Sequence, residues 1–388
     1  MSPGLLWLLA VSSGLTVANL YYTQPLLADI ARAFGVGAHE AGLVTTFTQL
    51  GYATGLLVFV PLADSHDRRP LILGAATGGM LGLLALGLSP TFPVLLVVSY
   101  LLGCLTMTPQ LSVPFAATLA DDKSRGRSVG VVMSGLLVGI LLSRTVSGVL
   151  GGPFGWRAPF FVAAAATLVL VAILWNKLPS QKPPRQVPYR ELLSSLPRLV
   201  RDSAPLRRHA ILGALTFGAF SVFWTTLPFR LALAPLHYGS EVAGLFGLLG
   251  VAGALAAPLA GRLSDRYGSR WVNAGAIATV VVSYAVFALA GHTLVGIGAG
   301  VVLLDFGAQA NHISNQTRVL GLDAARRNRL NTVYMVAYFI GGATGSALGA
   351  WAWNRWAWDG VTACGAAFGV VGLIGFALLP GVETRSDR

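Results

Sequence analysis

The chain has 388 residues, of which 54% are hydrophobic and only 11% are charged. Soluble domains carry roughly 25% charged residues, so this composition excludes an ordinary soluble protein and indicates a protein that crosses a membrane several times. The net charge of +12 does not indicate a nucleic-acid partner, because the basic residues lie dispersed in short loops and form no continuous basic face. The two cysteines, Cys104 and Cys364, both lie in apolar runs and predict no disulfide framework.

Apolar stretches separated by loop signals predict an all-α membrane protein with twelve transmembrane spans. The predicted spans of the first half cover about 5–28, 39–62, 70–89, 92–119, 127–150 and 157–176. Those of the second half cover about 209–233, 240–262, 270–290, 293–318, 328–351 and 358–380. The first run begins at Leu5 with no basic segment before it and no cleavage site after it, so we expect a retained span rather than a signal peptide.

The sequence indicates an internal duplication. A charged segment at 60–69 has a second copy at 261–270, and Asp64 and Asp265 are 201 positions apart. Arg127 and Arg329, at the start of corresponding spans, are 202 positions apart. Repeats of this kind predict two pseudo-symmetric six-helix halves, at 1–176 and 209–388, joined by a polar linker at 177–208.

The two charged segments resemble the short loop motif of the major facilitator superfamily, Gly-x-Leu-Ala-Asp-Arg-x-Gly-Arg-Arg. The second copy keeps Gly261, Asp265, Arg266, Gly268 and Arg270 of the motif. The first copy keeps Leu62, Ala63, Asp64, Arg68 and Arg69 of the motif. It departs from the motif with Val60 and Asp67 at the glycine positions and with Ser65 at the first arginine. The resemblance implies transport by alternating access, with no cofactor, and a conformational latch formed by Asp64, Arg68, Arg69, Asp265, Arg266 and Arg270.

Orientation follows from the basic residues. With the N-terminus inside, most of them fall in the loops, linker and tail on the cytoplasmic side. The positive-inside rule therefore predicts a multi-pass protein of a bacterial-type inner membrane with both termini and the linker in the cytoplasm.

The predicted tenth span is the most polar of the apolar runs. It carries Asp305, Gln309, Asn311, His312, Asn315 and Gln316. At 100° per residue, Asp305, Gln309, His312 and Gln316 fall within an arc of roughly 60°. Burial favours the neutral form of a carboxyl group, and histidine titrates near neutral pH, so Asp305 and His312 are candidates for proton coupling. The alternative is a hydrogen-bond network that only holds helices together.

The fifth span carries Arg144 inside the membrane, where it requires an anion, a carboxylate or a water-filled cavity. In the drug/proton antiporter branch that the chain resembles, the corresponding segment reads Gly-Pro-x-x-Gly-Gly, whereas here it reads Ser-Arg-Thr-Val-Ser-Gly at 143–148. The gating role of that motif is therefore in doubt, and Arg144 is read either as a contact of the substrate or proton site or as half of a structural ion pair. The same span repeats small residues every four positions, from Gly135 to Gly151, and the eleventh span does so from Gly341 to Gly349; this spacing allows either a moving seam or static close packing.

The other candidate cavity residues lie on the first, seventh, tenth and eleventh spans. They are Asn19, Tyr22, Gln24, Trp224, Arg230, Gln309, Asn331, Tyr334 and Tyr338. Pro25 and Pro228 loosen the backbone nearby, as spans that line a cavity tolerate. Interfacial anchoring or packing is the alternative for each aromatic residue.

The sequence contains no enzyme signature and no metal-ligand spacing. The resemblance to the bacterial drug/proton and sugar efflux branch implies a secondary transporter of a small amphipathic or sugar-like molecule that acts by proton-coupled efflux, and we expect a monomer in the lipid bilayer. Uptake or facilitated transport of a small organic anion is the alternative, favoured by Arg144 and Arg230. A non-transporting receptor is the alternative of another class, and it would need no polar stripe at mid-membrane depth.

Overall fold

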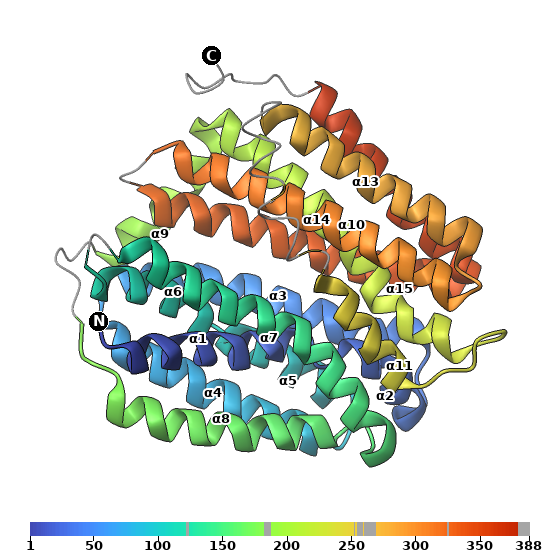
Figure 1. Cartoon of the computed structure of the whole chain (residues 1–388), viewed down its shortest axis with the longest axis horizontal. Helices are drawn as coiled ribbons and strands as arrows, with labels where there is room; N and C mark the ends of the chain where they lie inside the picture. Colours follow the sequence, from blue (N-terminus) through green and yellow to red (C-terminus); the bar gives the residue numbers. More distant parts are fainter. Residues whose placement is uncertain are drawn as a thin grey trace. The chain divides into compact units, whose positions relative to one another are not determined.

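The computed structural model describes residues 1–121, 124–181, 188–251, 253, 259, 269–323 and 326–378. Within these residues all regular structure is helical (Figure 1). The elements of the first part are α1 (Pro3–Val17), η1 (Ala18–Leu20), η2 (Gln24–Leu26), α2 (Leu27–Phe34), α3 (Ala38–Ser65), α4 (Arg68–Leu88), α5 (Phe92–Leu105), α6 (Thr108–Leu119), α7 (Arg125–Phe154) and α8 (Ala158–Lys177). Those that follow are α9 (Tyr189–Asp202), α10 (Ala204–Ala232), α11 (Ser240–Leu245), η3 (Phe246–Gly250), α13 (Ser269–Ala290), α14 (Leu294–Gly321) and α15 (Arg327–Leu378).

Ten helical segments of the described chain are long and apolar enough to cross a membrane. One of them, α15, covers the two spans predicted at 328–351 and 358–380, and its backbone leaves helical geometry at Trp356 and Ala357. The span predicted at 240–262 begins with α11 and η3, and most of its remainder lies outside the described residues. The count of twelve spans therefore stays a prediction.

The first predicted span is interrupted in the middle. Its α-helical structure ends at Val17 and resumes at Leu27, with two 3-10 turns between them. Pro25 lies in the second turn and cannot donate the hydrogen bond that a continuous helix needs there. Pro228, its counterpart in the second half, lies inside the continuous helix α10. The two prolines match in sequence but only the first coincides with a helix break.

Two further features were not predicted. The fourth span is divided into α5 and α6 at Thr106 and Met107, just before Pro109, which has no N–H to continue the helix. The linker, for which the sequence analysis predicted no regular element, contains the amphipathic helix α9. Leu192, Leu196 and Leu199 form the buried stripe of α9, spaced as one helix face requires.

The described residues form two compact units. Unit 1 contains 1–35, 47–193 and 239–247, and unit 2 contains 36–46, 194–238 and 248–388. In unit 1, α1 packs along α7, and α4 packs along α8 (Figure 1). A Cβ atom at Gly135 would lie 2.3 Å from the carbonyl oxygen of Ala10, and one at Gly139 would lie 2.1 Å from that of Gly14. The small residues of α7 thus allow the α1 backbone to come close, as predicted.

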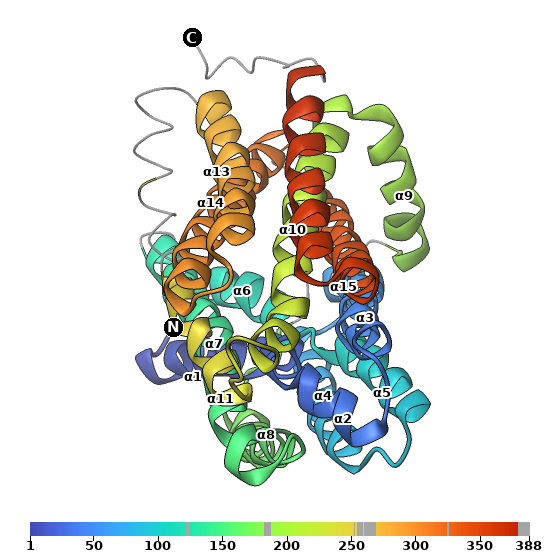
Figure 2. The ribbon, with the colours of Figure 1, turned by 90° about the vertical axis from the view of Figure 1, so that its right-hand side faces the viewer.

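Unit 2 repeats this close packing between α10 and α15. A Cβ atom at Gly341 would lie 2.1 Å from the carbonyl oxygen of Ala214, and one at Gly345 would lie 2.1 Å from that of Gly218. Helices α13 and α14 also pack against each other in this unit (Figure 2). The glycine ladders of both halves therefore serve close helix packing within a unit.

Each unit contains a short segment taken from the sequence of the other half. Helix α11 follows the linker in sequence but packs on α7 in unit 1. Gly148 of α7 faces Gly244 of α11, and a Cβ atom at residue 148 would lie 2.7 Å from the Cα atom of Gly244. The first turns of α3 belong to unit 2, where a Cβ atom at Gly42 would lie 2.4 Å from Cβ of Ala350. Gly42 and Gly244 are 202 positions apart, and so are Gly148 and Ala350. The two helix crossings are thus repeats of one another.

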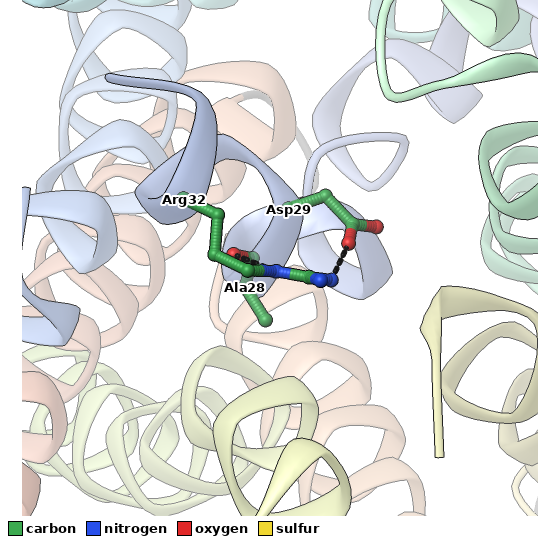
Figure 3. A network of polar contacts seen from close by, with 3 residues as sticks. All are labelled: Ala28, Asp29 and Arg32. Carbon is green, nitrogen blue, oxygen red and sulfur yellow. Dashed lines mark hydrogen bonds and ion pairs between the residues drawn. The ribbon is translucent and has the colours of Figure 1, made fainter. Parts of the chain in front are cut away.

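The end of α2 carries a surface ion pair between Asp29 and Arg32, one helical turn apart (Figure 3). The Nε atom of Arg32 also donates to the carbonyl oxygen of Ala28. The Arg32 side chain is 72% exposed, and an exposed pair of this kind contributes roughly 0–1 kcal/mol to stability. It is a local feature of the helix end.

Candidate functional site

A buried carboxylate lies near the middle of α14. Asp305 is 4% exposed, and it accepts a hydrogen bond of 3.2 Å from the indole nitrogen of Trp224 on α10. Trp224 is itself buried and sits against Phe220 and Phe223. The structure therefore brings Asp305, a candidate for proton coupling, into direct contact with Trp224, a candidate cavity residue from a different span.

The polar stripe of α14 continues toward α15. His312 lies with its Nδ1 atom 3.0 Å from the hydroxyl oxygen of Tyr334, which also donates to the backbone oxygen of His312 at 3.2 Å. The ring of His312 is 4.5 Å from that of Tyr338, and Tyr338 stacks on Phe217 at 4.1 Å. The structure thus brings His312, Tyr334 and Tyr338 together in one aromatic cluster between α10, α14 and α15.

The remaining members of the stripe have separate contacts. Gln316 donates to the side-chain oxygen of Asn331 on α15 at 2.9 Å. Gln309 is half-buried, and its Cγ atom would lie 2.9 Å from a Cβ atom at Gly253. The stripe therefore extends from Asp305 to Gln316 along one side of α14, with partners on α10 and α15.

Unit 1 contains a buried guanidinium. Arg144 of α7 is 2% exposed, and its Nε atom donates to the side-chain oxygen of Gln24 at 2.7 Å. Its guanidinium carbon lies 4.8 Å from the ring centroid of Tyr21. Gln24 and Tyr21 both belong to the interruption of the first span, so the broken helix provides the polar and aromatic partners of Arg144.

Asn19 lies in the same interruption and is 1% exposed. Neither its side-chain nitrogen nor its side-chain oxygen has a hydrogen-bond partner among the described residues. Its nitrogen would lie 3.3 Å from a Cβ atom at Gly79 of α4, and Tyr22 is buried three residues further along the chain. A buried amide without partners is costly by roughly 1–3 kcal/mol for each group, and such a group in a native protein requires water or a ligand.

Arg230 has a different kind of environment. Its Nε atom donates to the backbone oxygen of Gly291 at 2.9 Å, and one terminal nitrogen donates to that of Ala234 at 3.1 Å. Its guanidinium also faces the ring of Trp358 at 5.8 Å. These contacts stabilise the end of α13, and the structure does not place Arg230 in the contacts of Trp224 and Asp305.

A second polar network in unit 2 was missed by sequence analysis. His209 of α10 lies 2.8 Å from the side-chain oxygen of Asn315, which also accepts from Asn273 at 2.6 Å. Asn311 donates to Asn273 at 2.5 Å and accepts from Asn315 at 3.0 Å. All four residues are buried. The spacing of Asn311 and Asn315 on α14 was visible in the sequence. Their partners, His209 on α10 and Asn273 on α13, are isolated polar residues near the ends of the predicted spans, and no sequence pattern singled them out.

The first charged segment joins the start of α4 to the ends of α6 and α8. Arg68 donates to the Pro114 backbone oxygen at 3.4 Å and to the Thr118 hydroxyl at 3.2 Å, and Arg69 donates to the Trp175 backbone oxygen at 2.8 Å. The charge of Asp64 acts on Arg68. Of the latch residues in the second segment, Arg270 is described, as an exposed residue of α13, whereas Asp265 and Arg266 lie outside the described residues.

Asp67 has a structural role that the motif did not suggest. It stands where the motif has glycine, and it caps α4 by accepting from the backbone nitrogen of Arg69 at 2.9 Å. It also accepts from the backbone nitrogen of Gln181 at 3.0 Å and from the hydroxyl of Ser180. The departure from the motif therefore adds a helix cap that binds the chain after α8.

Comparison with known proteins decides the family. The sequence profile described as Major Facilitator Superfamily matches residues 6–322. The chain belongs to the major facilitator superfamily. It is a membrane transporter and not an enzyme, and its all-helical architecture is the one expected for this superfamily.

Two similar relatives of this transporter are bacterial proteins. It is 40% identical to the uncharacterized transporter YgaY of Escherichia coli O157:H7 over 96% of this chain and 95% of that protein. It is 37% identical to a protein of Streptomyces coelicolor described as a transporter, over 96% of this chain and 87% of that protein. A bacterial homologue of the lysosomal transporter Spinster, in an inward-facing and unoccupied conformation, gives a TM-score of 0.80 at 14% identity, covering 98% of this chain and 97% of that one. At that identity the likeness supports the fold alone.

The latch hypothesis for this transporter gives a first prediction. Asp64→Asn should cut transport several-fold, because the neutral side chain no longer acts on Arg68, while equilibrium binding of a transported substrate stays within a few-fold. Transport by the purified protein in liposomes and binding in detergent measure the two effects. Asp67→Ala is the matched control: it should lower the free energy of unfolding by roughly 1–2 kcal/mol through loss of a cap. Loss of binding together with transport in Asp64→Asn would show that Asp64 serves folding or the binding site instead.

Proposed function

We propose that this transporter exports a small amphipathic or sugar-like molecule in exchange for protons, by alternating access of a site near mid-membrane depth. The observation that carries the proposal is the contact of the buried Asp305 carboxylate with the Trp224 indole, next to a cluster of aromatic rings. A carboxylate withdrawn from water is a functional candidate in a membrane protein, because burying its charge is expensive. Proton exchange at Asp305 supplies the driving force, with His312 as the second titratable group on the same stripe.

The substrate class follows from the neighbouring groups. The rings of Phe217, Phe220, Trp224 and Tyr338 provide flat apolar surface. In the same unit, the Asp305 carboxylate and the His312 ring lie against these aromatic rings as polar groups. Aromatic rings together with a few polar groups suit a molecule that is partly apolar and carries hydroxyl or amide groups. This combination supports the drug and sugar efflux branch as the nearest functional class.

Transport of a small organic anion is the second candidate. Its support is Arg144, a buried guanidinium that donates to the Gln24 side-chain oxygen at 2.7 Å and faces the ring of Tyr21. Guanidinium groups bind carboxylate and phosphate through paired N–H donors. Arg230, the other arginine expected to favour an anion, uses its donors on backbone oxygens instead.

A proteoliposome assay with an imposed pH gradient tests the proposal. Purified transporter is screened against panels of neutral amphipathic compounds, sugars and organic anions, with flux and internal pH measured together. The proposal expects substrate accumulation against its gradient, accompanied by counter-movement of protons. Counterflow without proton movement would show a facilitator, and accumulation restricted to anions would favour the second candidate.

Orientation gives a separate prediction. We propose the two six-helix halves at 1–176 and 209–388 with both termini and the 177–208 linker in the cytoplasm, because the basic residues concentrate there. A cysteine introduced at the exposed position Ser194 of α9 should resist membrane-impermeant thiol reagents added to intact cells, and should react after the cells are opened. A cysteine at the exposed loop residue Tyr238 should show the opposite pattern. Rapid labelling of residue 194 from outside would reverse the orientation.

A further inference from the structure

Arginine side chains from α10 and α13 face the ring of Phe376, near the end of α15, in unit 2. The guanidinium carbon of Arg208, near the start of α10, lies 5.1 Å from the ring centroid of Phe376, near the end of α15. That of Arg270, at the start of α13, lies 5.9 Å from the same ring. Arg318, in the last turn of α14, is near enough for its charge to act on Arg208. We refer to Arg208, Arg270, Arg318 and Phe376 as the Phe376 cluster.

Arg208 is the buried member of this cluster, with an exposure of 7%. One terminal nitrogen donates to the backbone oxygen of Phe376 at 3.2 Å. Its Nε–H is buried and has no acceptor among the described residues. A buried guanidinium is stabilised when its donors are satisfied and its charge is balanced, yet the charges of Arg270 and Arg318 both repel it. The geometry therefore calls for an anionic acceptor.

The second copy of the duplicated segment contains one carboxylate fewer than the first. In the first copy Asp67 lies beside Arg68 and Arg69 and accepts from Ser180, Gln181 and the Arg69 backbone. In the second copy the position of Asp67 is occupied by Gly268, while the arginine aligned with Arg69 is retained as Arg270. The second half has thus kept the cation and lost one carboxylate, and it has added Arg208 and Arg318.

We propose that the Phe376 cluster binds a phosphate group, with Arg208 and Arg270 as its principal donors. The forked N–H donors of arginine match the oxygens of a phosphate, and Phe376 offers apolar surface beside it. The group can come from the headgroup of an anionic lipid or from free phosphate, and both offer the same chemistry. In the orientation proposed above the cluster lies at the cytoplasmic ends of the spans, where anionic lipids are concentrated. This binding is separate from the transported substrate.

Thermal unfolding of the full-length transporter in a neutral maltoside detergent tests the proposal. The probes are dioctanoyl phosphatidylglycerol, inorganic phosphate and dioctanoyl phosphatidylcholine, each titrated alone. The wild type should show a saturable rise of the unfolding midpoint with phosphatidylglycerol. Arg270→Gln, at an exposed position, and Arg208→Gln should each require at least about tenfold more lipid for half of the effect. Arg207→Gln is the matched control, because Arg207 is exposed and bonds to the backbone oxygens of Val200 and Arg201.

The outcomes divide the possibilities. A rise with phosphatidylglycerol but not with phosphate supports a lipid headgroup, and an equal rise with both supports a phosphate group from either source. Arg270→Gln keeps the test decisive if Arg208→Gln does not fold. A wild-type unfolding midpoint that neither phosphatidylglycerol nor phosphate raises would overturn the proposal and make Asp265 the counter-ion to examine. So would an effect that persists in Arg270→Gln, or one that phosphatidylcholine reproduces.

Discussion

Asp305→Asn is expected to abolish substrate accumulation driven by a pH gradient while leaving substrate exchange at equal concentrations intact. Asparagine keeps the size of the side chain and an oxygen that can accept from Trp224, but it cannot bind or release a proton. Coupling of transport to the pH gradient therefore fails, whereas the rearrangement of the transporter with bound substrate requires no proton exchange at residue 305. Gradient-driven uptake and counterflow in the same proteoliposome preparation measure the two activities.

Two further variants sharpen this test. Asp29→Asn changes a carboxylate of the surface pair and should leave gradient-driven transport near the wild-type level. Trp224→Phe keeps a ring but removes the donor to Asp305, and it should weaken coupling without abolishing it. If Asp305→Asn still accumulates substrate under a pH gradient, Asp305 does not couple, and His312→Gln becomes the variant to examine by the same assay.

Gly148→Leu is expected to reduce transport at least about tenfold, because any side chain there collides with α11. A Cβ atom at residue 148 would lie 2.3 Å from the Ser240 backbone oxygen and 2.7 Å from Cα of Gly244. Real Cβ contacts are longer, so α11 would have to move away from α7. Alternating access needs both the closed and the open arrangement of such a crossing, and this variant removes the closed one.

The control lies on the same helix. Gly130 of α7 is exposed, with nothing within 4 Å of a Cβ atom, so Gly130→Leu should transport normally. Ala350→Leu, at the repeat-related crossing with Gly42, should behave like Gly148→Leu. Size-exclusion profiles show whether each variant is folded. Wild-type transport by a folded Gly148→Leu protein would exclude a functional role for this crossing.

Sequence periodicity predicted part of the candidate site. The arc of polar residues on the tenth span placed Asp305, His312 and Gln316 on one side of a helix, and the structure provides that side with partners on α10 and α15. The identity of those partners was not predictable, because periodicity describes a single helix and carries no information about its neighbours. Trp224 was a candidate for other reasons, and its bond to Asp305 is visible only in three dimensions.

Helix breaks likewise depend on tertiary contacts that the sequence does not reveal. Pro25 and Pro228 are matched in sequence, yet the first span is interrupted around Pro25 and α10 continues through Pro228. A proline removes one donor in both cases, and tertiary packing decides whether the helix ends there. Asp67 is a similar case: it looked like a departure from a glycine motif, and its function as a helix cap depends on Ser180 and Gln181, which are distant in sequence.

The exchange of short segments between the two units constrains how the protein is synthesised. Residues 239–247 complete unit 1, although they emerge from the ribosome after the linker, and residues 36–46 in unit 2 pack against Thr225 and Ala350 of helices made much later. A nascent chain that stops after residue 208 thus leaves the small-residue surface around Gly148 uncovered and the first turns of α3 without their neighbours. Neither unit can therefore be completed before residues from both halves have been synthesised, and an arrested half should be recognised by quality-control proteases as incomplete.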